Sequence, residues 1–379
     1  MKYFPFHINL LTVLSLVLLF SGCASDDDLG FSTPDDPDAI PRGRNVQVVE
    51  DEVGGVPIVL AGSVGRSFIV SFRREAEDGS LRSFSAVQQA LPIVMEDDRG
   101  NRYDVFGTAL EGPEQGTRLT PTYGMVGFWF AVGTFYEGVE IYGESSVGAT
   151  DFIPEATGSW RIPFEEVYLI TARDAIPAID EPQFVSEAQT GNTIANSPLQ
   201  DSDLVLGVRV GEEIHLYPHR ILDWHEIVND ELRQTPFSVI YCPLTGTGNA
   251  WLRGQTTFGV SGLLYNTNII PFDRATETLW SQLVGQAVFG DRVDEIPEQL
   301  TVAEMTWGAW KDFYTAPEIL SFETGFRRDY SEYPYGDYRT NDEAINFPIL
   351  NLDERLPAKE RVHFVTLNGK TKAYRFTAF

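Results

Sequence analysis

The stretch from Tyr217 to Arg274 decides the fold, because it combines strand-forming runs, turn residues and reactive side chains. It reads YPHRILDWHEIVND (217–230), FSVIYCPLTGTGNAW (237–251) and FGVSGLLYNTNIIPFDR (258–274). The runs are short, rich in β-branched and aromatic residues, and separated by glycine, proline and asparagine, a pattern typical of β-strands joined by tight turns. The stretch also contains His219, His225 and Cys242.

The rest of the chain repeats this strand pattern. Strands are predicted at 68–72, 126–132, 168–170 and 237–241. Helices are few. Residues 221–230 place Ile221, Trp224 and Val228 on one face, and shorter helices are predicted at 306–313 and 279–283. These patterns predict a β-rich α+β fold with few short helices.

Three short segments recur in order at nearly one spacing. Residues 50–59 match 229–238 at an offset of 179, 98–101 match 273–276 at 175, and 129–141 match 307–319 at 178. Ordered matches at one offset indicate an internal repeat. We therefore predict two related β-rich halves, 45–200 and 201–379, whose repeated parts span about 45–160 and 200–325.

A fourth match lies at the C-terminus. Residues 362–374 have the spacing of 205–217 at an offset of 157. Within them, Asn368-Gly369 is a strong signal for a two-residue hairpin, because both turn positions need positive φ. No such hairpin precedes the first half. The C-terminal hairpin is therefore expected to complete the N-terminal half.

Residues 1–22 are expected to be a lipoprotein signal peptide. Lys2 gives a positive start, the apolar run 8–20 is too short to span a bilayer, and Leu19-Phe20-Ser21-Gly22-Cys23 resembles a lipobox. Cys23 would then carry the lipid, and a plain membrane anchor is the alternative. Residues 23–44 are rich in aspartate and proline, which predicts an acidic disordered tether.

The acidic residues after Cys23 bear on location. Ala-Ser-Asp-Asp-Asp resembles the signal that sends lipoproteins of Bacteroidetes-type bacteria to the outer face of the outer membrane. We therefore expect a bacterial outer-membrane lipoprotein that meets the membrane through Cys23. Exposure at the cell surface and a plain acidic spacer both stay open.

Charge and cysteine content exclude two possibilities. The chain has 28 basic and 55 acidic residues, a net charge of −27. Phosphate backbones are bound through Lys and Arg, so no nucleic acid partner is expected. If Cys23 carries lipid, Cys242 is the only thiol left, and no intramolecular disulfide forms.

Several motifs carry a resemblance to a known family. They are WHEIVND (224–230), VIYCPLTGTG (239–248), FGVSGLLYNTN (258–268), TW..W (306–310) and TGFRRDYSEYPYGDY (324–338). From about Leu204 to Phe379 the chain resembles the bacterial and archaeal family called domain of unknown function 3179. The resemblance implies export, and the family's usual CPLC motif, with selenoproteins among its members, implies thiol or selenol redox chemistry. Here Thr245 stands at the second cysteine position, so this loop has no two-thiol cycle.

Cys242 follows a predicted strand and opens a turn, a place where a loop stays accessible. His225 in the preceding helix could pair with it as a base. Glu226, Asn229 or Asp230 would orient the imidazole. This hypothesis makes Cys242, His225, Glu226 and Asp230 the catalytic candidates. The alternatives are a buried cysteine and a histidine hydrogen-bonded beneath its helix.

His219, His225 and Cys242 also offer nitrogen and sulfur ligands to zinc or copper. Pro218 interrupts regular strand pairing beside His219, which leaves the geometry of such a site open. No cofactor other than zinc or copper is expected.

Further polar residues are predicted to bind a ligand. Those between 265 and 282 could equally form a buried polar network, because buried polar groups must be paired. An aromatic loop with tyrosines at 330, 333, 335 and 338 either lines a cleft for sugars or peptides or is pinned over the body. The binding candidates are Tyr217, His219, Asn229, Ser261, Tyr265, Asn266, Asp273, Arg274, Gln282, Arg328 and Tyr330.

Three functional classes stay open: a single-thiol enzyme or redox protein, a ligand- or metal-binding module, and a surface scaffold. The missing second cysteine favours the last two. We expect a lipid-anchored binding or scaffold module with a cleft around Cys242 and His225. Its ligand could be a small molecule, a glycan or a protein.

Overall fold

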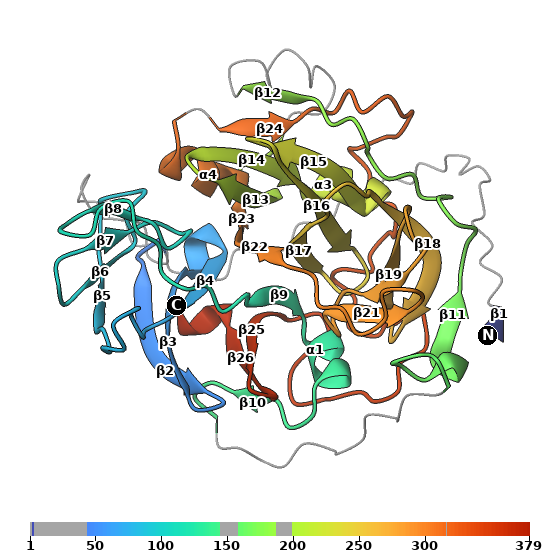
Figure 1. Ribbon diagram of the computed structural model, residues 1–379, viewed down its shortest axis with the longest axis horizontal. Coiled ribbons are helices and arrows are strands. Elements are labelled where there is room, and N and C mark those ends of the chain that lie inside the picture. Colours follow the sequence, from blue (N-terminus) through green and yellow to red (C-terminus); the bar gives the residue numbers. More distant parts are fainter. Residues whose placement is uncertain (1, 4–43, 145–157, 187–198, 316) are drawn as a thin grey trace, which may run out of the picture.

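The computed structural model describes residues 2–3, 44–144, 158–186, 199–315 and 317–379 (Figure 1). Strands dominate these residues and the α-helices are short, which confirms the predicted β-rich α+β class. Of the predicted signal peptide and tether, only residues 2, 3 and 44 are described, so Cys23 lies outside them. Within the described ranges, no helix has the length and apolar character needed to cross a membrane.

Two sheets of the first half have close counterparts in the second. The first half forms a sheet of β2 (Gln47–Val53), β3 (Val56–Ser63) and β4 (Phe68–Arg73), and another of β5 (Phe84–Ala86), β6 (Met95–Asp97), β7 (Arg102–Tyr103) and β8 (Ala109–Glu111). The second half forms a sheet of β15 (Ile227–Leu232), β16 (Thr235–Cys242), β17 (Thr247–Leu252) and β22 (Gln299–Leu300). Its other sheet contains β18 (Phe258–Tyr265), β19 (Asn268–Asp273), β20 (Leu279–Ser281) and β21 (Gln286–Phe289), with β11 (Val167–Leu169) and β1 (Lys2–Tyr3) added at one edge.

Two further sheets each join a hairpin to strands from elsewhere in the chain. One has the order β10 (Glu140–Ile141), β26 (Lys370–Arg375), β25 (Arg361–Leu367) and β9 (Met125–Phe128). The other has the order β12 (Phe184–Ser186), β24 (Glu318–Leu320), β14 (Glu213–Pro218), β13 (Leu204–Val210) and β23 (Val302–Thr306). The helices α1 (Trp129–Phe135), α3 (His219–His225) and α4 (Trp307–Phe313) follow β9, β14 and β23.

Strand registers repeat between the halves. Ala61 of β3 lies opposite Val70 of β4, as Ile240 of β16 lies opposite Asn249 of β17. Both positions are shifted by 179 residues, the offset found in the sequence. The two halves are therefore related in strand pairing as well as in sequence.

The C-terminal hairpin completes a sheet of the first half, as predicted. β25 pairs antiparallel with β9 and β26 parallel with β10, as β13 pairs with β23 and β14 with β24. In register, His363 lies opposite Val126, and Leu206 lies opposite Glu304. His363 and Leu206 are 157 residues apart, and Glu304 and Val126 are 178 apart, which are the offsets found in the sequence. The C-terminal hairpin therefore belongs to the sheet that contains β9.

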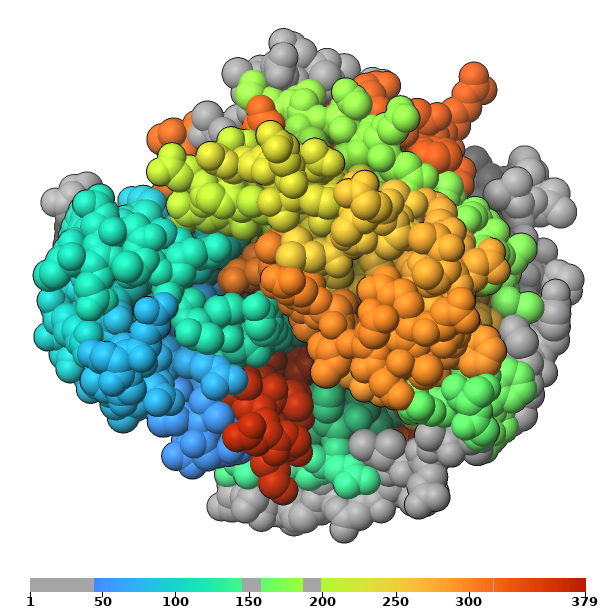
Figure 2. Space-filling view, in the orientation of Figure 1, coloured from blue at the N-terminus to red at the C-terminus, as the bar shows by residue number. Residues whose placement is uncertain are grey.

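Five strands meet at the centre of the molecule. β4 contacts β23 and β25, and β17 contacts β9 and β23. Figure 1 shows the sheets set around this point, with β5–β8 at one outer side and β18–β21 toward the other. The space-filling view is hollowed there, between the teal N-terminal strands and the orange strands near residue 300 (Figure 2). The centre is therefore a junction of both halves.

Three local predictions were wrong. The strand predicted at 126–132 ends at Phe128, because the run Trp129–Phe135 forms α1 and buries nearly all its side chains. The helix predicted at 279–283 is instead β20, which pairs with β21. The helix predicted at 221–230 ends at His225, because Glu226 has φ 58° and β15 follows. Short apolar runs do not distinguish strand from helix by periodicity. The helix predicted at 306–313 is confirmed as α4.

Candidate functional site

Cys242 ends β16 and is only 1% exposed. Its Sγ lies 3.8 Å from the carbonyl oxygen of Thr267. Burial, and then the charge of Glu226, raise the pKa of the thiol to about 11, although hydrogen bonds from Thr245 lower it slightly. A thiol with this pKa is protonated near neutral pH, and the thiolate is the nucleophile. Cys242 is therefore placed as a buried thiol beside Glu226 and Thr245.

His225 ends α3 and is fully buried. Its Nδ1 lies 2.8 Å from the carbonyl oxygen of Pro177, and its Nε2 lies 2.7 Å from the hydroxyl of Tyr330. Burial lowers the pKa of the imidazole. Both ring nitrogens thus have partners other than Cys242, and the geometry joins His225 to the aromatic loop instead.

Glu226 lies beside Cys242 in a strained and buried position. It has φ 58° and ψ −36°, a sparsely populated conformation that costs a non-glycine residue on the order of 1–3 kcal/mol. Burial raises the pKa of its carboxyl to about 8, against a small opposing effect of the Tyr335 hydroxyl 3.5 Å away. Strain and a shifted pKa at one residue are features that gather at functional sites.

An acidic and aromatic cluster covers the thiol. Arg339 donates to Asp223 at 2.6 Å, and its guanidinium carbon lies 3.6 Å from the centre of the Tyr333 ring. Tyr338 is buried and donates to the carbonyl oxygen of Leu244 at 2.9 Å. The aromatic loop is therefore pinned over the body at Cys242.

Asn229 and Asp230 connect strands. Asp230 accepts from the hydroxyl of Tyr217 at 2.6 Å and lies 2.7 Å from Nδ1 of His215. Asn229 donates to the carbonyl oxygen of Phe258 at 2.8 Å and accepts from its backbone N–H at 2.9 Å. These bonds tie β15 to β14 and β18. Neither side chain is bonded to His225.

Gln282 is the hub of a buried network beneath the Cys242 turn. Its Nε2 donates to the carbonyl oxygens of Ile240 and Thr247 at 2.9 and 3.1 Å, and its Oε1 accepts from Thr247 and Asn268 at 2.7 and 2.8 Å. Asn268 also donates to Thr245 at 2.9 Å. The hydroxyl of Thr245 thus takes part in this network.

The remaining candidates have separate local partners. Ser261 donates to the Ile270 carbonyl, Tyr265 lies edge-on to Phe135 at 5.5 Å, Asn266 accepts from the Leu350 N–H at 2.9 Å, Asp273 accepts from Trp280 Nε1 at 3.1 Å, Arg274 pairs with Asp180 at 2.7 Å, and Arg328 lies over the Trp224 ring at 5.8 Å. Their roles in binding stay predictions.

The three predicted metal ligands are engaged separately. Nε2 of His219 lies 3.1 Å from Glu304 Oε2. In the part of the chain that the structure describes, no three His, Cys, Asp or Glu side chains are grouped to hold a metal ion. A zinc or copper site at His219, His225 and Cys242 stays a prediction.

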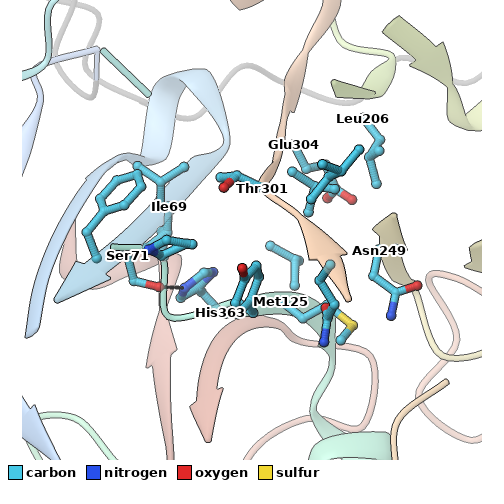
Figure 3. A pocket seen from close by; sticks show the side chains of 18 residues that line it. Ile69, Ser71, Met125, Leu206, Asn249, Thr301, Glu304 and His363 are labelled. Atoms are coloured by element: carbon cyan, nitrogen blue, oxygen red, sulfur yellow. Dashed lines mark hydrogen bonds between the residues drawn. The ribbon is translucent and has the colours of Figure 1, made fainter. Parts of the chain in front are cut away.

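A cavity at the junction of β4, β9, β17 and β23 contains polar residues that the sequence analysis missed. Ser71, Asn249, Glu304 and His363 line it, and it offers about 30 Å³ to the centre of a water-sized sphere. That is room for about two water molecules. Figure 3 shows Ser71 and His363 on one side and Asn249 opposite. The cavity is thus small, and both polar and apolar side chains line it, with Tyr123 among them.

Glu304 and His363 both have a lowered pKa, for different reasons. Burial alone would raise the pKa of Glu304, but His219 and Arg361 outweigh it and lower that pKa to about 2. Burial lowers the pKa of His363 to about 3. Near neutral pH the wall therefore holds a carboxylate that Arg361 and His219 contact, and an uncharged imidazole.

Two cavity side chains have unused hydrogen-bonding capacity. Asn249 is 3% exposed, and neither Nδ2 nor Oδ1 has a partner among the described residues. His363 bonds Ser71 through Nε2 at 2.8 Å, while its Nδ1 has no partner there either. Buried polar groups are nearly always paired. These atoms therefore need a hydrogen-bonding partner, either water or a ligand.

Sequence reasoning missed these residues because no motif marks them. Asn249 directly follows the motif VIYCPLTGTG (239–248), and His363 lies within the predicted closing hairpin. The available signal was the repeat itself: at equivalent positions, Asn249 replaces Val70 and His363 replaces Leu206. Polar residues that replace apolar ones between related halves would have indicated this cavity.

One family model matches the chain, with the description Protein of unknown function (DUF3179), over residues 173–379. No curated protein matches the chain. No solved structure matches it. The match covers more than half of the sequence, including the Cys242 turn, the aromatic loop and the closing hairpin. The chain belongs to the DUF3179 family.

Proposed function

We propose that this protein is a binding module that holds a small polar ligand in its central cavity. One observation carries the proposal: Asn249, almost fully buried at the cavity wall, has no partner for either amide atom among the described residues. Leaving a buried donor or acceptor unpaired costs about 1–3 kcal/mol. A ligand that pairs both atoms recovers that cost.

The alternative of a single-thiol enzyme has one observation in its favour. Burial raises the pKa of the Glu226 carboxyl to about 8. The charge of this carboxyl raises the pKa of the Cys242 thiol, and the carboxylate could accept the proton of the thiol. The thiol itself is buried and carries a raised pKa, which opposes attack on a substrate. The binding function therefore ranks first.

A ligand screen tests the binding function. Purified wild-type protein is heated with sugars, amino acids, dipeptides and simple amides, and its melting temperature is measured. A ligand at 100 times its Kd stabilises the folded state by about 2.7 kcal/mol. We expect a hit that stabilises wild type and not Asn249→Val, which installs the residue of the equivalent position, Val70. A hit that stabilises both proteins equally, or no hit, contradicts the proposal.

The proposal places the module at the bacterial outer membrane, anchored through lipid on Cys23. The lipobox-like sequence Leu19–Cys23 and the aspartates after it support this location. Cys23→Ala is expected to leave the precursor unprocessed or the protein released, because Cys23 would carry all the acyl chains. Stable anchoring needs more than one such chain. Cys242→Ala is the control and should stay anchored. Normal processing and membrane association of Cys23→Ala would refute the anchor.

A further inference from the structure

The free hydrogen-bonding atoms of the cavity define what can pair with them. Asn249 presents a donor and an acceptor from one amide. At the opposite side, Thr122 donates to the carbonyl oxygen of Ser71 at 3.1 Å, and the hydroxyls of Ser71 and Thr122 lie 2.6 Å apart. Ser71 then donates to Thr122 and accepts from Nε2 of His363, which leaves Nδ1 of His363 as an acceptor. The ligand must therefore both donate and accept.

Charge favours an uncharged ligand. The one carboxylate on the wall, Glu304, already contacts Arg361 and His219. His363 is neutral near pH 7, because burial lowers its pKa to about 3. The whole chain carries a net charge of −27, which repels anions. Phosphates and carboxylates are thus disfavoured.

One of the residues that line the cavity, Tyr123, is an exposed aromatic residue. Tyr123 is 47% exposed and has φ 54°, a conformation that is an outlier for a bulky residue. Pro121 and Gln299 line the same cavity. An exposed ring held in a strained backbone beside the cavity offers a stacking face.

We propose that the ligand is a neutral sugar, the end of a glycan, which inserts hydroxyl groups between Asn249 and His363 and stacks its ring on Tyr123. This rests on the proposed binding function and names the ligand class of the same cavity. One hydroxyl donates to Oδ1 of Asn249, and its neighbour accepts from Nδ2 of Asn249 and donates to Nδ1 of His363. The narrow base admits the hydroxyl groups, and the sugar ring stays at the mouth.

Calorimetric titration with defined probes tests the sugar class. The probes are methyl glycosides of glucose, galactose and mannose, N-acetylglucosamine, and cellobiose, with acetamide and glycylglycine as amide comparators. We expect at least one sugar to bind. Asn249→Val should weaken it about tenfold or more, through loss of two hydrogen bonds. Tyr123→Ala should weaken it about fivefold, and Tyr123→Phe should not, because the ring remains.

The outcomes separate the two proposals. If acetamide or glycylglycine binds in an Asn249-dependent way and no sugar does, the sugar class is wrong and the binding function stands. If neither sugars nor amides bind the folded protein, both are overturned. Sugar binding that Tyr123→Ala leaves unchanged overturns the stacking geometry. Since Tyr123 is exposed, its variants should keep the wild-type melting temperature, which makes a loss of binding interpretable even if Asn249→Val fails to fold.

Discussion

At the scale of single residues, burial sets the chemistry around Cys242. Burial is the main cause that raises the pKa of its thiol to about 11 and the pKa of the Glu226 carboxyl to about 8. Neither has a cation as its closest partner. Such groups stay protonated near neutral pH, which suits a packed interior better than a reactive pair.

Alkylation of Cys242 should therefore be slow. Relative to an ordinary thiol with pKa near 8.5, its thiolate fraction at neutral pH is lower by on the order of a hundredfold or more. Iodoacetamide labelling of the folded protein should be slower than that of a cysteine peptide by at least this factor, speed up as pH rises toward 11, and become fast in urea. His225→Ala should not change the native rate, because its nitrogens bond Pro177 and Tyr330. Rapid labelling that depends on His225 would restore the thiol-enzyme hypothesis.

Glu226 should make stability fall as pH rises. Its folded pKa of about 8 exceeds the unfolded value of about 4.3, so its contribution is fully present below the lower value and is lost as pH rises toward 8. Between these two pKa values, the free energy of unfolding falls by up to about 1.4 kcal/mol per pH unit. Urea denaturation at pH 5 and at pH 8 gives the free energy of unfolding of Glu226→Gln relative to that of wild type. This difference should shift in favour of the variant by roughly 3 kcal/mol between the two pH values. The exposed Glu332→Gln is the control, and a parallel pH profile for both variants would contradict the assignment.

At the scale of elements, turn chemistry shows how far sequence reasoning reaches. Asn368-Gly369 was predicted as a hairpin, and both residues have positive φ. The β15–β16 turn has positive φ at Arg233 and Gln234, yet neither residue signals such a turn. Pairing of β15 with β16 imposes this conformation against local preference. Propensity therefore finds the turns whose residues agree with their conformation and misses the strained ones.

Gln234→Gly should stabilise the protein. The left-handed conformation costs a non-glycine residue about 1–2 kcal/mol, and glycine removes most of it. Thermal or urea unfolding should show a gain of about 1 kcal/mol. The matched control is Gly55→Gln at the equivalent position of the β2–β3 turn, where φ is 78° and a Cβ meets no atom, so a similar loss is expected. A loss of stability in Gln234→Gly would show that its side chain contributes more than its strain costs.

At the scale of the whole molecule, the repeat and the closure could be predicted and the cavity could not. Offsets near 178 and the Asn-Gly signal lie along the chain, so one sequence reveals them. The cavity instead forms where strands from four sheets meet, and its polar residues come from positions as distant as 71 and 363. The two halves also share one hydrophobic core, in which Trp129 and Phe130 of α1 join Ile270 and Trp280. Spatial convergence of this kind leaves no local pattern.

Removing the closing hairpin should unfold the whole protein. In register, β25 fills the place between β9 and β26, and Val365 and Tyr374 are fully buried in a cluster with Ile58 and Leu60. Deleting residues 362–379 exposes this cluster and the open edge of β9, while typical domains are stable by only about 5–15 kcal/mol. The truncated chain is expected to be insoluble or to lack a cooperative transition by calorimetry.

A point variant tests the same closure without shortening the chain. A Cβ on Gly54 would lie 2.1 Å from the carbonyl oxygen of Leu367 at the end of β25, whereas one on Gly55 meets nothing. Both glycines have positive φ, so the backbone strain of an alanine is similar at the two sites. Gly54→Ala should therefore lower the free energy of unfolding by roughly 2 kcal/mol more than Gly55→Ala, a cost typical of overpacking. Equal effects in the two variants, or a truncated chain that melts like wild type, would show that the halves hold together without the closing hairpin.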